Sequence, residues 1–336
     1  MLAAFSIYVY LEGMKPEAKQ AILSCTNADE FSVSEIIQEL WSDYGSIQRL
    51  TLLNGDYPSV VLKEIIAPKK SQHPRGWNTQ TSHERKLKSY EVEVNWYQNY
   101  SDLCSDECRV PLHLMSKKGN SSLILLEDLN SVGFSARKTT VSIGEINTCL
   151  NWLANFHANF INVNPVGLWE IGTYWHLGTR NDEFEVMSEG PIKEHAHKLD
   201  EVLNTCRFQT IVHGDAKLAN FCFSKDGKQV AAVDFQYVGG GCGMKDVAYF
   251  LGSCLDEREC HKYESSALNY YFESLKLALT KGKNELDFSV LEKEWRELYP
   301  IAWTDFTRFL LGWSPSHQKL NRYSKELAER AINWLT

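Results

Sequence analysis

The feature that most constrains this chain is the stretch at residues 211–220, IVHGDAKLAN, which is followed by Asp234 in the run QVAAVDFQ. Transfer of a phosphoryl group to a hydroxyl needs a carboxylate beside the hydroxyl proton and oxygen ligands that hold Mg²⁺ on the nucleotide phosphates. Asp215 is placed to accept or orient that proton, and Asn220 and Asp234 offer the oxygen ligands. An Asp and an Asn with four residues between them have the spacing of a kinase catalytic loop.

Short apolar runs follow this stretch. Residues 221–223 and 230–233 flank the pair Asp226-Gly227, and this pattern is typical of a β-hairpin. A hairpin at this place would deliver Asp234 to the catalytic loop. We therefore expect the loop to lie between short buried strands.

The combination of HGDAKLAN with VDFQ resembles the aminoglycoside phosphotransferase and choline kinase-like superfamily, whose fold is that of protein kinases and which typically carries HGD in place of HRD. The resemblance spans most of the chain. It implies that Asp215 is the catalytic base, that Asn220 and Asp234 bind Mg²⁺, and that His213 braces the loop. Lys217 matches protein kinases better than most antibiotic kinases, and we expect it to touch the transferring phosphate. HGD alone is short and often marks a turn, so the prediction depends on the whole combination.

Composition sets the broad class. A chain of 336 residues with 43% hydrophobic residues can bury a sizeable core in about two domains. The net charge of −8 argues against a general nucleic-acid or anionic-membrane surface. Nine cysteines without a CxxC pair or a secretory signal favour reduced thiols and a cytoplasmic location. The apolar first eleven residues are too short to span a bilayer, and translation from Met14 is a second hypothesis for the start.

Residues 1–129 are predicted to form a β-rich N-lobe that binds the nucleotide. Ser32 and Glu35 match a capping box, which predicts a short helix ending near residue 43. Residues 46–53 and 60–66 are β-rich runs on either side of Asn-Gly-Asp and predict a hairpin. The phosphate loop is expected at residues 44–46, where backbone N–H groups of Gly45 and Ser46 would reach phosphate oxygens.

Lys63, in the run VVLKEI, is the candidate lysine for the ATP phosphates. An isolated lysine in an apolar strand needs a negative partner, although an ordinary edge-strand lysine is the alternative. We expect that partner on a helix at residues 83–100. Glu93 is favoured over Glu91, because the two point to different faces of the helix and Glu93 lies beside aromatic packing.

The run SSLILLEDL, at residues 121–129, predicts the last strand of the N-lobe and the hinge. By the resemblance, the backbone of Glu127, Asp128 and Leu129 would bind the adenine edge of ATP. The polar segment at residues 67–82 has two interpretations, a mobile flap over the nucleotide and a solvated surface loop.

Residues 130–336 are predicted to form a mainly helical C-lobe with the catalytic loop, the metal site and the acceptor-binding helices. An amphipathic helix begins after Ser142 and carries His157 as a packed core residue. By the resemblance, Asp246 braces the catalytic loop or caps a helix. Three helical patterns follow at residues 262–281, 287–313 and 319–335, and by the resemblance such helices carry acceptor specificity. Candidates for acceptor contacts, with core packing as the alternative, are Trp303, Asp305, Arg308 and Trp313.

The sequence therefore predicts an α+β, protein kinase-like bilobal fold with an antiparallel β-sheet N-lobe, a mainly helical C-lobe and ATP in the cleft. The predicted reaction is phosphorylation of a small-molecule hydroxyl by ATP with Mg²⁺, without a nucleic-acid or membrane partner. A protein substrate is disfavoured, because no APE-like element follows VDFQ. A non-catalytic nucleotide-binding scaffold is the main alternative, and a metallophosphoesterase would leave Lys63 unexplained. The acceptor, the choice between ATP and GTP and the oligomeric state stay open.

Overall fold

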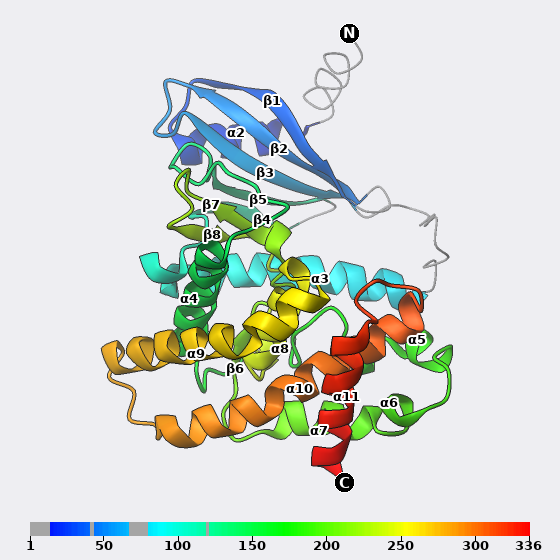
Figure 1. Ribbon diagram of the computed structural model, residues 1–336. Coiled ribbons are helices and arrows are strands. Elements are labelled where there is room, and N and C mark those ends of the chain that lie inside the picture. The colour runs from blue at the N-terminus through cyan, green and yellow to red at the C-terminus, as the bar shows by residue number, and fades with distance from the viewer. Residues whose placement is uncertain (1–13, 41–43, 67–79, 119–120) are drawn as a thin grey trace. The chain divides into compact units, whose positions relative to one another are not determined.

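The computed structural model describes residues 14–40, 44–66, 80–118 and 121–336 of the chain (Figure 1). The chain divides into two compact units. The first unit comprises Met1–Asp102 and Val110–Ser135, and the second comprises Leu103–Arg109 and Ala136–Thr336. Each unit has its own secondary structure, a sheet in the first and mostly helices in the second.

The first unit is built on one five-stranded antiparallel sheet with the strand order β1-β2-β3-β5-β4. Helix α2 packs on this sheet through apolar residues such as Ile22, which meets Leu50 and Leu62 in one buried cluster (Figure 1). The predicted hairpin at residues 46–66 is confirmed by the pairing of β2 with β3. The strands are β1 (Glu30–Glu39), β2 (Gly45–Leu53), β3 (Ser59–Ile66), β4 (His113–Lys117) and β5 (Ser121–Glu127), and the helices are α2 (Pro16–Thr26) and α3 (Gln80–Asn99).

The helix predicted from the capping-box pattern at Ser32 and Glu35 is wrong, because these residues lie in β1. β1 is an edge strand of the sheet, and two irregularities in its pairing with β2 interrupt the alternation of its side chains. The irregularities let a strand accommodate apolar residues, such as Ile36, at a sequence spacing that is typical of a helix. Bulges also protect an edge strand from pairing with another chain.

Helix α3 agrees closely with the helix predicted at residues 83–100. Most of the polar segment before it, at residues 67–79, lies outside the described residues, so neither interpretation of that segment is tested. Its last residues, 80–82, belong to the first turn of α3.

The second unit is mainly helical, and two short β-pairs hold its loops (Figure 1). Helix α4 begins at a capping box, in which Ser142 accepts from Glu145 N and Glu145 accepts from Ser142 N. The helices are α4 (Ile143–Asn159), α5 (Asn181–Glu185), α6 (Pro191–Glu194), α7 (Ala196–Thr205), α8 (Met244–Cys254), α9 (Glu257–Lys281), α10 (Phe288–Trp313) and α11 (Arg322–Leu335). The strands are β6 (Thr210–Val212), paired with β9 (Gly239–Gly241), and β7 (Phe221–Phe223), paired with β8 (Val230–Ala232).

The β7–β8 hairpin is the one predicted from the apolar runs around Asp226-Gly227, and this prediction is confirmed. The three C-terminal helical patterns are confirmed as α9, α10 and α11. The α+β, protein kinase-like fold class is confirmed as well, with an antiparallel sheet in one unit and mainly helices in the other.

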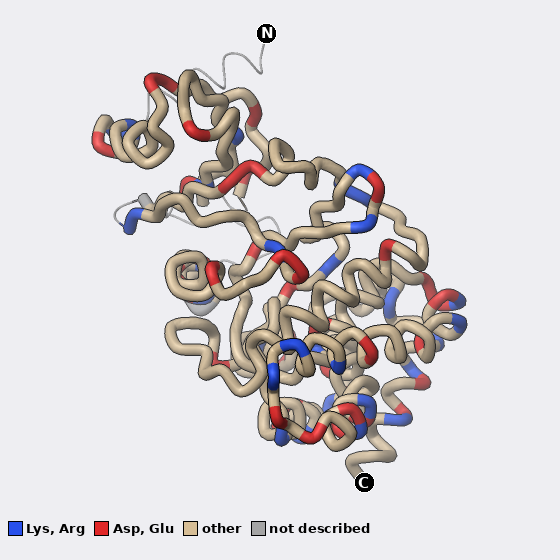
Figure 2. The backbone as a smooth tube through the Cα atoms, turned by 90° about the vertical axis from the view of Figure 1, so that its left-hand side faces the viewer, with Lys and Arg blue, Asp and Glu red and all other residues tan. Residues whose placement is uncertain are grey.

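Residues of both charge signs are distributed along the backbone (Figure 2). Examples are the pair of Arg296 with Glu292 and the pair of Arg322 with Glu326, each one helical turn apart at 2.7 Å. Such pairs keep the outer faces of the helices polar. Among the described residues, no helix combines the length and the apolar character that a membrane span requires.

Candidate active site

The predicted catalytic loop connects β6 with β7. Asp246 of α8 holds this loop through hydrogen bonds to its backbone. The two carboxylate oxygens of Asp246 accept from the backbone N–H groups of His213, at 2.6 Å, and Gly214, at 2.9 Å. Asp246 is fully buried and lies in the first turn of α8, where the helix dipole favours a negative charge. Of the two roles expected for Asp246, the structure supports the brace of the loop.

His213 connects the loop to the β7–β8 hairpin. Its Nδ1 accepts from the backbone N–H of Asp215 at 3.3 Å, so the ring proton belongs on Nε2, which donates to the carbonyl oxygen of Val233 at 3.1 Å. Val233 also donates its own N–H to the carbonyl oxygen of Asn220 at 3.0 Å. Both ends of the loop are therefore fastened to the residue that precedes Asp234.

The backbone conformation at position 214 explains why the residue before the predicted base is a glycine. Its φ of +79° lies in the left-handed region, and a Cβ at this position would stand 2.0 Å from the carbonyl oxygen of Tyr237. Only glycine lets the chain pass this close to residue 237.

Asp215 is almost completely buried, and its two carboxylate oxygens have different surroundings. Oδ2 accepts from Lys217 Nζ at 2.7 Å and from Asn220 Nδ2 at 3.0 Å, whereas Oδ1 is buried and has no hydrogen-bond partner among the described residues. Burial raises the pKa of Asp215, Lys217 lowers it, and the charge of Asp234 raises it further. A carboxylate with one buried oxygen left over suits a ligand that brings a hydrogen-bond donor.

Lys217 and Asn220 hold the carboxylate of Asp215 in place. Burial acts to lower the pKa of Lys217, but the carboxylates of Asp215 and Asp234 outweigh it and the pKa is raised, so Lys217 stays charged. The side-chain amide of Asn220 donates through Nδ2 to both the carbonyl oxygen and the carboxylate of Asp215. This orientation turns the amide oxygen of Asn220 away from the base.

Asp234 follows β8 and has a left-handed backbone with φ of +71°. This backbone conformation is uncommon for residues other than glycine. Such backbone strain tends to be kept at functional positions. The carboxylate oxygen Oδ1 accepts from Gln236 Nε2 at 2.5 Å.

The oxygens of Asn220 and Asp234 fit Mg²⁺, because that ion prefers hard oxygen ligands and keeps several positions for water and phosphate. Among the described residues, no group of three or more His, Cys, Asp and Glu side chains forms a metal cage. A site that takes only two protein ligands needs no such cage.

The first unit brings Lys63 and Glu93 together. Lys63 Nζ of β3 lies 2.6 Å from Glu93 Oε2 of α3, and both side chains are at most 5% exposed. β3 has neighbours on both sides, which excludes the edge-strand alternative for Lys63. Glu91, the competing partner, is exposed.

Gly45 and Ser46 lie in β2 and not in a loop, so that part of the phosphate-loop prediction is wrong. Gly45 has φ of +116°, and a Cβ there would stand 2.0 Å from the carbonyl oxygen of Glu64 on β3. The pairing with β3 therefore accounts for this glycine. The buried hydroxyl of Ser46 accepts from Gln48 Nε2 at 2.9 Å. Contact of the two residues with phosphate stays a prediction.

The residues predicted for the hinge turn their side chains into the protein. Glu127 Oε2 accepts from the backbone N–H of Leu112 at 3.1 Å, and Asp128 Oδ2 accepts from Arg49 Nε at 2.8 Å. The carbonyl oxygen of Leu129 accepts from Phe134 N at 2.9 Å. Adenine binding by this segment, which the resemblance implies, would therefore have to use its backbone and stays a prediction.

The residues predicted as acceptor contacts on α10 are mostly core. Asp305 and Arg308 form a fully buried ion pair at 2.9 Å, and both contact Trp175, whose Nε1 donates to Asp305 at 3.1 Å. Trp303 donates through Nε1 to Ser324 at 2.9 Å. These contacts fix the loop at residues 165–180 and helix α11 to α10.

The sequence interpretation missed a cluster of three residues in the second unit, namely Tyr249 of α8, Phe306 of α10 and Lys319. Lys319 Nζ lies 5.5 Å from the ring centre of Tyr249 and 5.6 Å from that of Phe306. The charge of Asp215 acts on both Tyr249 and Lys319. No spacing rule connects residues so distant in the chain, so only their aromatic and charged character was available as a signal.

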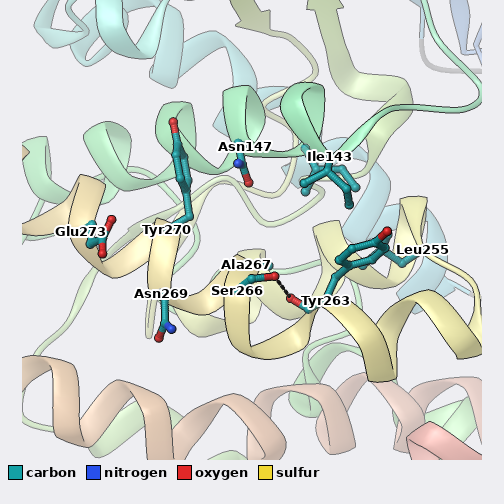
Figure 3. Close-up of a pocket in the computed structure, with 10 residues that line it drawn as sticks. Ile143, Asn147, Leu255, Tyr263, Ser266, Ala267, Asn269, Tyr270 and Glu273 are labelled. Atoms are coloured by element: carbon teal, nitrogen blue, oxygen red, sulfur yellow. Dashed lines mark hydrogen bonds between the residues drawn. The ribbon is translucent and has the colours of Figure 1, made fainter.

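A separate pocket of about 280 Å³ lies between α4 and α9 (Figure 3). At its wall, the hydroxyl of Ser266 donates to the carbonyl oxygen of Tyr263 at 3.0 Å. The pocket contains none of the predicted site residues. Its lining residues are Ile143, Ile146, Asn147, Leu255, Tyr263, Ser266, Ala267, Asn269, Tyr270 and Glu273.

Comparison of the sequence with protein families finds a match in the second unit. Residues 176–283 match the model of the ecdysteroid kinase-like family. The matched segment contains the catalytic loop, Asp234 and Asp246. No significant match was found among curated protein sequences.

Comparison of the structure finds small-molecule kinases. An amicoumacin kinase, solved with AMP-PNP, Ca²⁺ and Ami, is 12% identical with a TM-score of 0.53, over 96% of this chain and 98% of the other. A candidate aminoglycoside phosphotransferase from Ralstonia eutropha is 12% identical with a TM-score of 0.52, over 96% and 98%. A microcompartment-associated aminopropanol kinase is 15% identical with a TM-score of 0.50, over 95% and 93%. The predicted resemblance is thus confirmed at the level of the fold, and the chain has the protein kinase-like fold that these small-molecule kinases share.

Proposed function

We propose that this chain is an ATP-dependent phosphotransferase that phosphorylates a hydroxyl group of a small molecule, with Asp215 as the base. The observation that carries the proposal is the buried Oδ1 atom of Asp215, which has no hydrogen-bond partner among the described residues. Oδ2 is meanwhile held by Lys217 and Asn220. A hydroxyl of the acceptor would supply the missing donor at the position where a base must act.

In the proposed reaction, the acceptor oxygen forms a bond to the γ-phosphorus while its proton passes to Asp215. The bond from the γ-phosphorus to the bridging oxygen breaks, and its electron pair stays on ADP. The raised pKa of Asp215 makes this carboxylate a better proton acceptor than an exposed aspartate. Lys217 keeps the carboxylate oriented and brings a positive charge beside the transferring group.

The proposed metal ligands belong to the second unit, and the proposed nucleotide contacts belong to the first. Asn220 and Asp234 are the proposed ligands of Mg²⁺, which neutralises phosphate charge when it is bound. Lys63 is the proposed contact for phosphate oxygens, and Glu93 holds its ammonium in place. We assign adenine to the backbone of residues 127–129, with Gly45 and Ser46 as further phosphate contacts.

The structural neighbours support the choice of nucleotide and of acceptor class. The amicoumacin kinase was solved with AMP-PNP, an ATP analogue, and with a divalent cation. The names of the neighbours describe kinases of small molecules. The family match covers the part of this chain that contains the predicted base and the metal ligands.

The test is a coupled assay of ADP release with Mg²⁺-ATP, run over a panel of small alcohols, sterol-like alcohols, aminoglycosides and choline analogues. We expect acceptor-dependent ADP from the wild type and a loss of at least about 100-fold in Asp215→Asn. A variant as active as the wild type would remove Asp215 as the base.

A parallel measurement of ATP binding separates the alternatives. ATP binding in the wild type and in Asp215→Asn, with no ADP from any acceptor, would favour the nucleotide-binding scaffold over the kinase. Hydrolysis of phosphate esters without nucleotide would favour a phosphoesterase.

A further inference from the structure

Lys319 lies in the connection between α10 and α11, and its backbone is fixed at both sides. Its N–H donates to His317 Nδ1 at 3.2 Å, and its carbonyl oxygen accepts from the hydroxyl of Ser324 at 2.6 Å. That hydroxyl in turn accepts from Trp303 Nε1 of α10. The place of Lys319 is therefore set by the packing of the two helices.

The ammonium group of Lys319 lies in an aromatic corner. Its Nζ is 5.5 Å from the ring centre of Tyr249 and 5.6 Å from that of Phe306. The two rings meet edge to face, with their centres 4.9 Å apart. Both distances to Nζ are within the range of a cation–π interaction. The corner is rigid, because both rings belong to one buried cluster with Trp175 and Phe309.

This aromatic corner is close to the proposed base. The charge of Asp215 acts on Lys319, on Tyr249 and on Tyr174. Burial lowers the pKa of Lys319 to about 8, so the charged form still predominates at pH 7. Among the described residues, no carboxylate lies within ion-pair distance of its Nζ.

We propose that Lys319 is a specificity-determining residue, whose ammonium fills the aromatic corner near Asp215 and excludes acceptors with a cationic nitrogen. This inference rests on the proposed phosphotransferase function. Lys217 is already paired with Asp215, and Lys319 already occupies the corner, so a cationic nitrogen placed there would be repelled by the ammonium group of Lys319. Lys319 also occupies the faces of the Tyr249 and Phe306 rings that would otherwise attract an amine. The acceptor is then a neutral or anionic hydroxyl compound.

The experiment measures binding of choline to the full chain at pH 7 by calorimetry, without nucleotide. Choline is a suitable probe because its quaternary nitrogen keeps its charge at every pH. We expect Lys319→Ala, which empties the corner, to bind choline at least about tenfold more tightly than the wild type. Lys319→Gln should show a smaller gain of the same sign, which keeps the test decisive if the alanine variant does not fold.

Two control variants complete the experiment. One keeps a positive charge at position 319, and the other removes a positive charge from a different position. Lys319→Arg should bind choline as weakly as the wild type, and so should Lys325→Ala, which removes an exposed lysine of α11. Choline binding by the wild type as tight as by Lys319→Ala, or no gain in the folded Ala and Gln variants, would overturn the proposal.

The acceptor assay distinguishes failure of this inference from failure of the proposed function. In an active enzyme, Lys319→Ala should raise turnover of amino alcohols relative to neutral alcohols about tenfold. An unchanged ratio would count against Lys319. If no variant releases ADP with any acceptor, the phosphotransferase proposal fails, and the role of Lys319 is still decided by the choline measurement.

Discussion

The side-chain amide of Asn220 donates through Nδ2 to Oδ2 of Asp215 at 3.0 Å, so the proposed metal ligand and the proposed base orient each other. Because the amide nitrogen faces the base, the amide oxygen is the atom left for a metal. The amide of Asn220 thus connects the far end of the catalytic loop to both the main chain and the side chain of Asp215.

Replacing Asn220 by aspartate should test this connection. Asn220→Asp removes the donor and sets a second carboxylate against Asp215, so the pKa of Asp215 should rise. We expect turnover at pH 7 to fall, and the acid limb of the pH–rate profile to move to higher pH. An ADP-release profile with its acid limb unmoved would contradict the predicted contact.

The raised pKa of Asp215 predicts how stability depends on pH. Its folded pKa lies above the unfolded value of about 3.9. Between these two values the folded chain binds more protons than the unfolded chain, so the charge of Asp215 makes the free energy of unfolding fall as pH rises. Asp215→Asn should therefore have a Tm at pH 7 equal to or above that of the wild type, despite its loss of activity. A clearly lower Tm in a thermal melt would contradict this.

The pair of Lys63 with Glu93 should respond strongly to single substitutions. Lys63→Met or Glu93→Met leaves one buried charge without its partner, which costs roughly 3–5 kcal/mol of stability. The double variant Lys63→Met/Glu93→Met should recover much of this loss, yet it should still fail to bind ATP. Urea unfolding of all three variants gives the coupling energy. Strictly additive losses would mean that the two side chains do not depend on each other.

Gly214 and Gly133 form a matched pair of glycines with left-handed backbones. A Cβ at Gly214 would stand 2.0 Å from a carbonyl oxygen, whereas a Cβ at Gly133 would meet nothing within 4 Å. Gly133→Ala should lower stability by only about 1 kcal/mol and leave turnover unchanged. Gly214→Ala should displace the loop and abolish most turnover. Equal effects of the two substitutions would show that the close approach at residue 214 is unimportant.

The catalytic loop and its hairpin could be predicted because their chemistry depends on residues close together in the sequence. The spacing from Asp215 to Asn220 lies within one loop, and Asp226-Gly227 sets the hairpin locally. The partner of Lys63 could also be predicted, since an isolated lysine in a buried strand requires a carboxylate and only one face of α3 can offer it.

Other parts could not be predicted, because they depend on contacts between distant segments. The pattern at Ser32 and Glu35 resembled a capping box, but the pairing of β1 with β2 and its two irregularities, which exist only once the sheet has formed, make this segment a strand. Gly45 looked like part of a phosphate loop, but the carbonyl oxygen of Glu64 on the neighbouring strand explains it. The corner around Lys319 combines three elements of the second unit and has no local pattern.

Val233 holds the catalytic loop through its main chain alone, by donating to Asn220 and accepting from His213. Its isopropyl group takes no part in either bond. Substitution of Val233 by another apolar residue would therefore keep both hydrogen bonds to the loop. Proline is the exception, since it has no N–H to offer. The catalytic loop and the β7–β8 hairpin are thus joined by main-chain atoms of Val233, and a comparison of side chains would not reveal this connection.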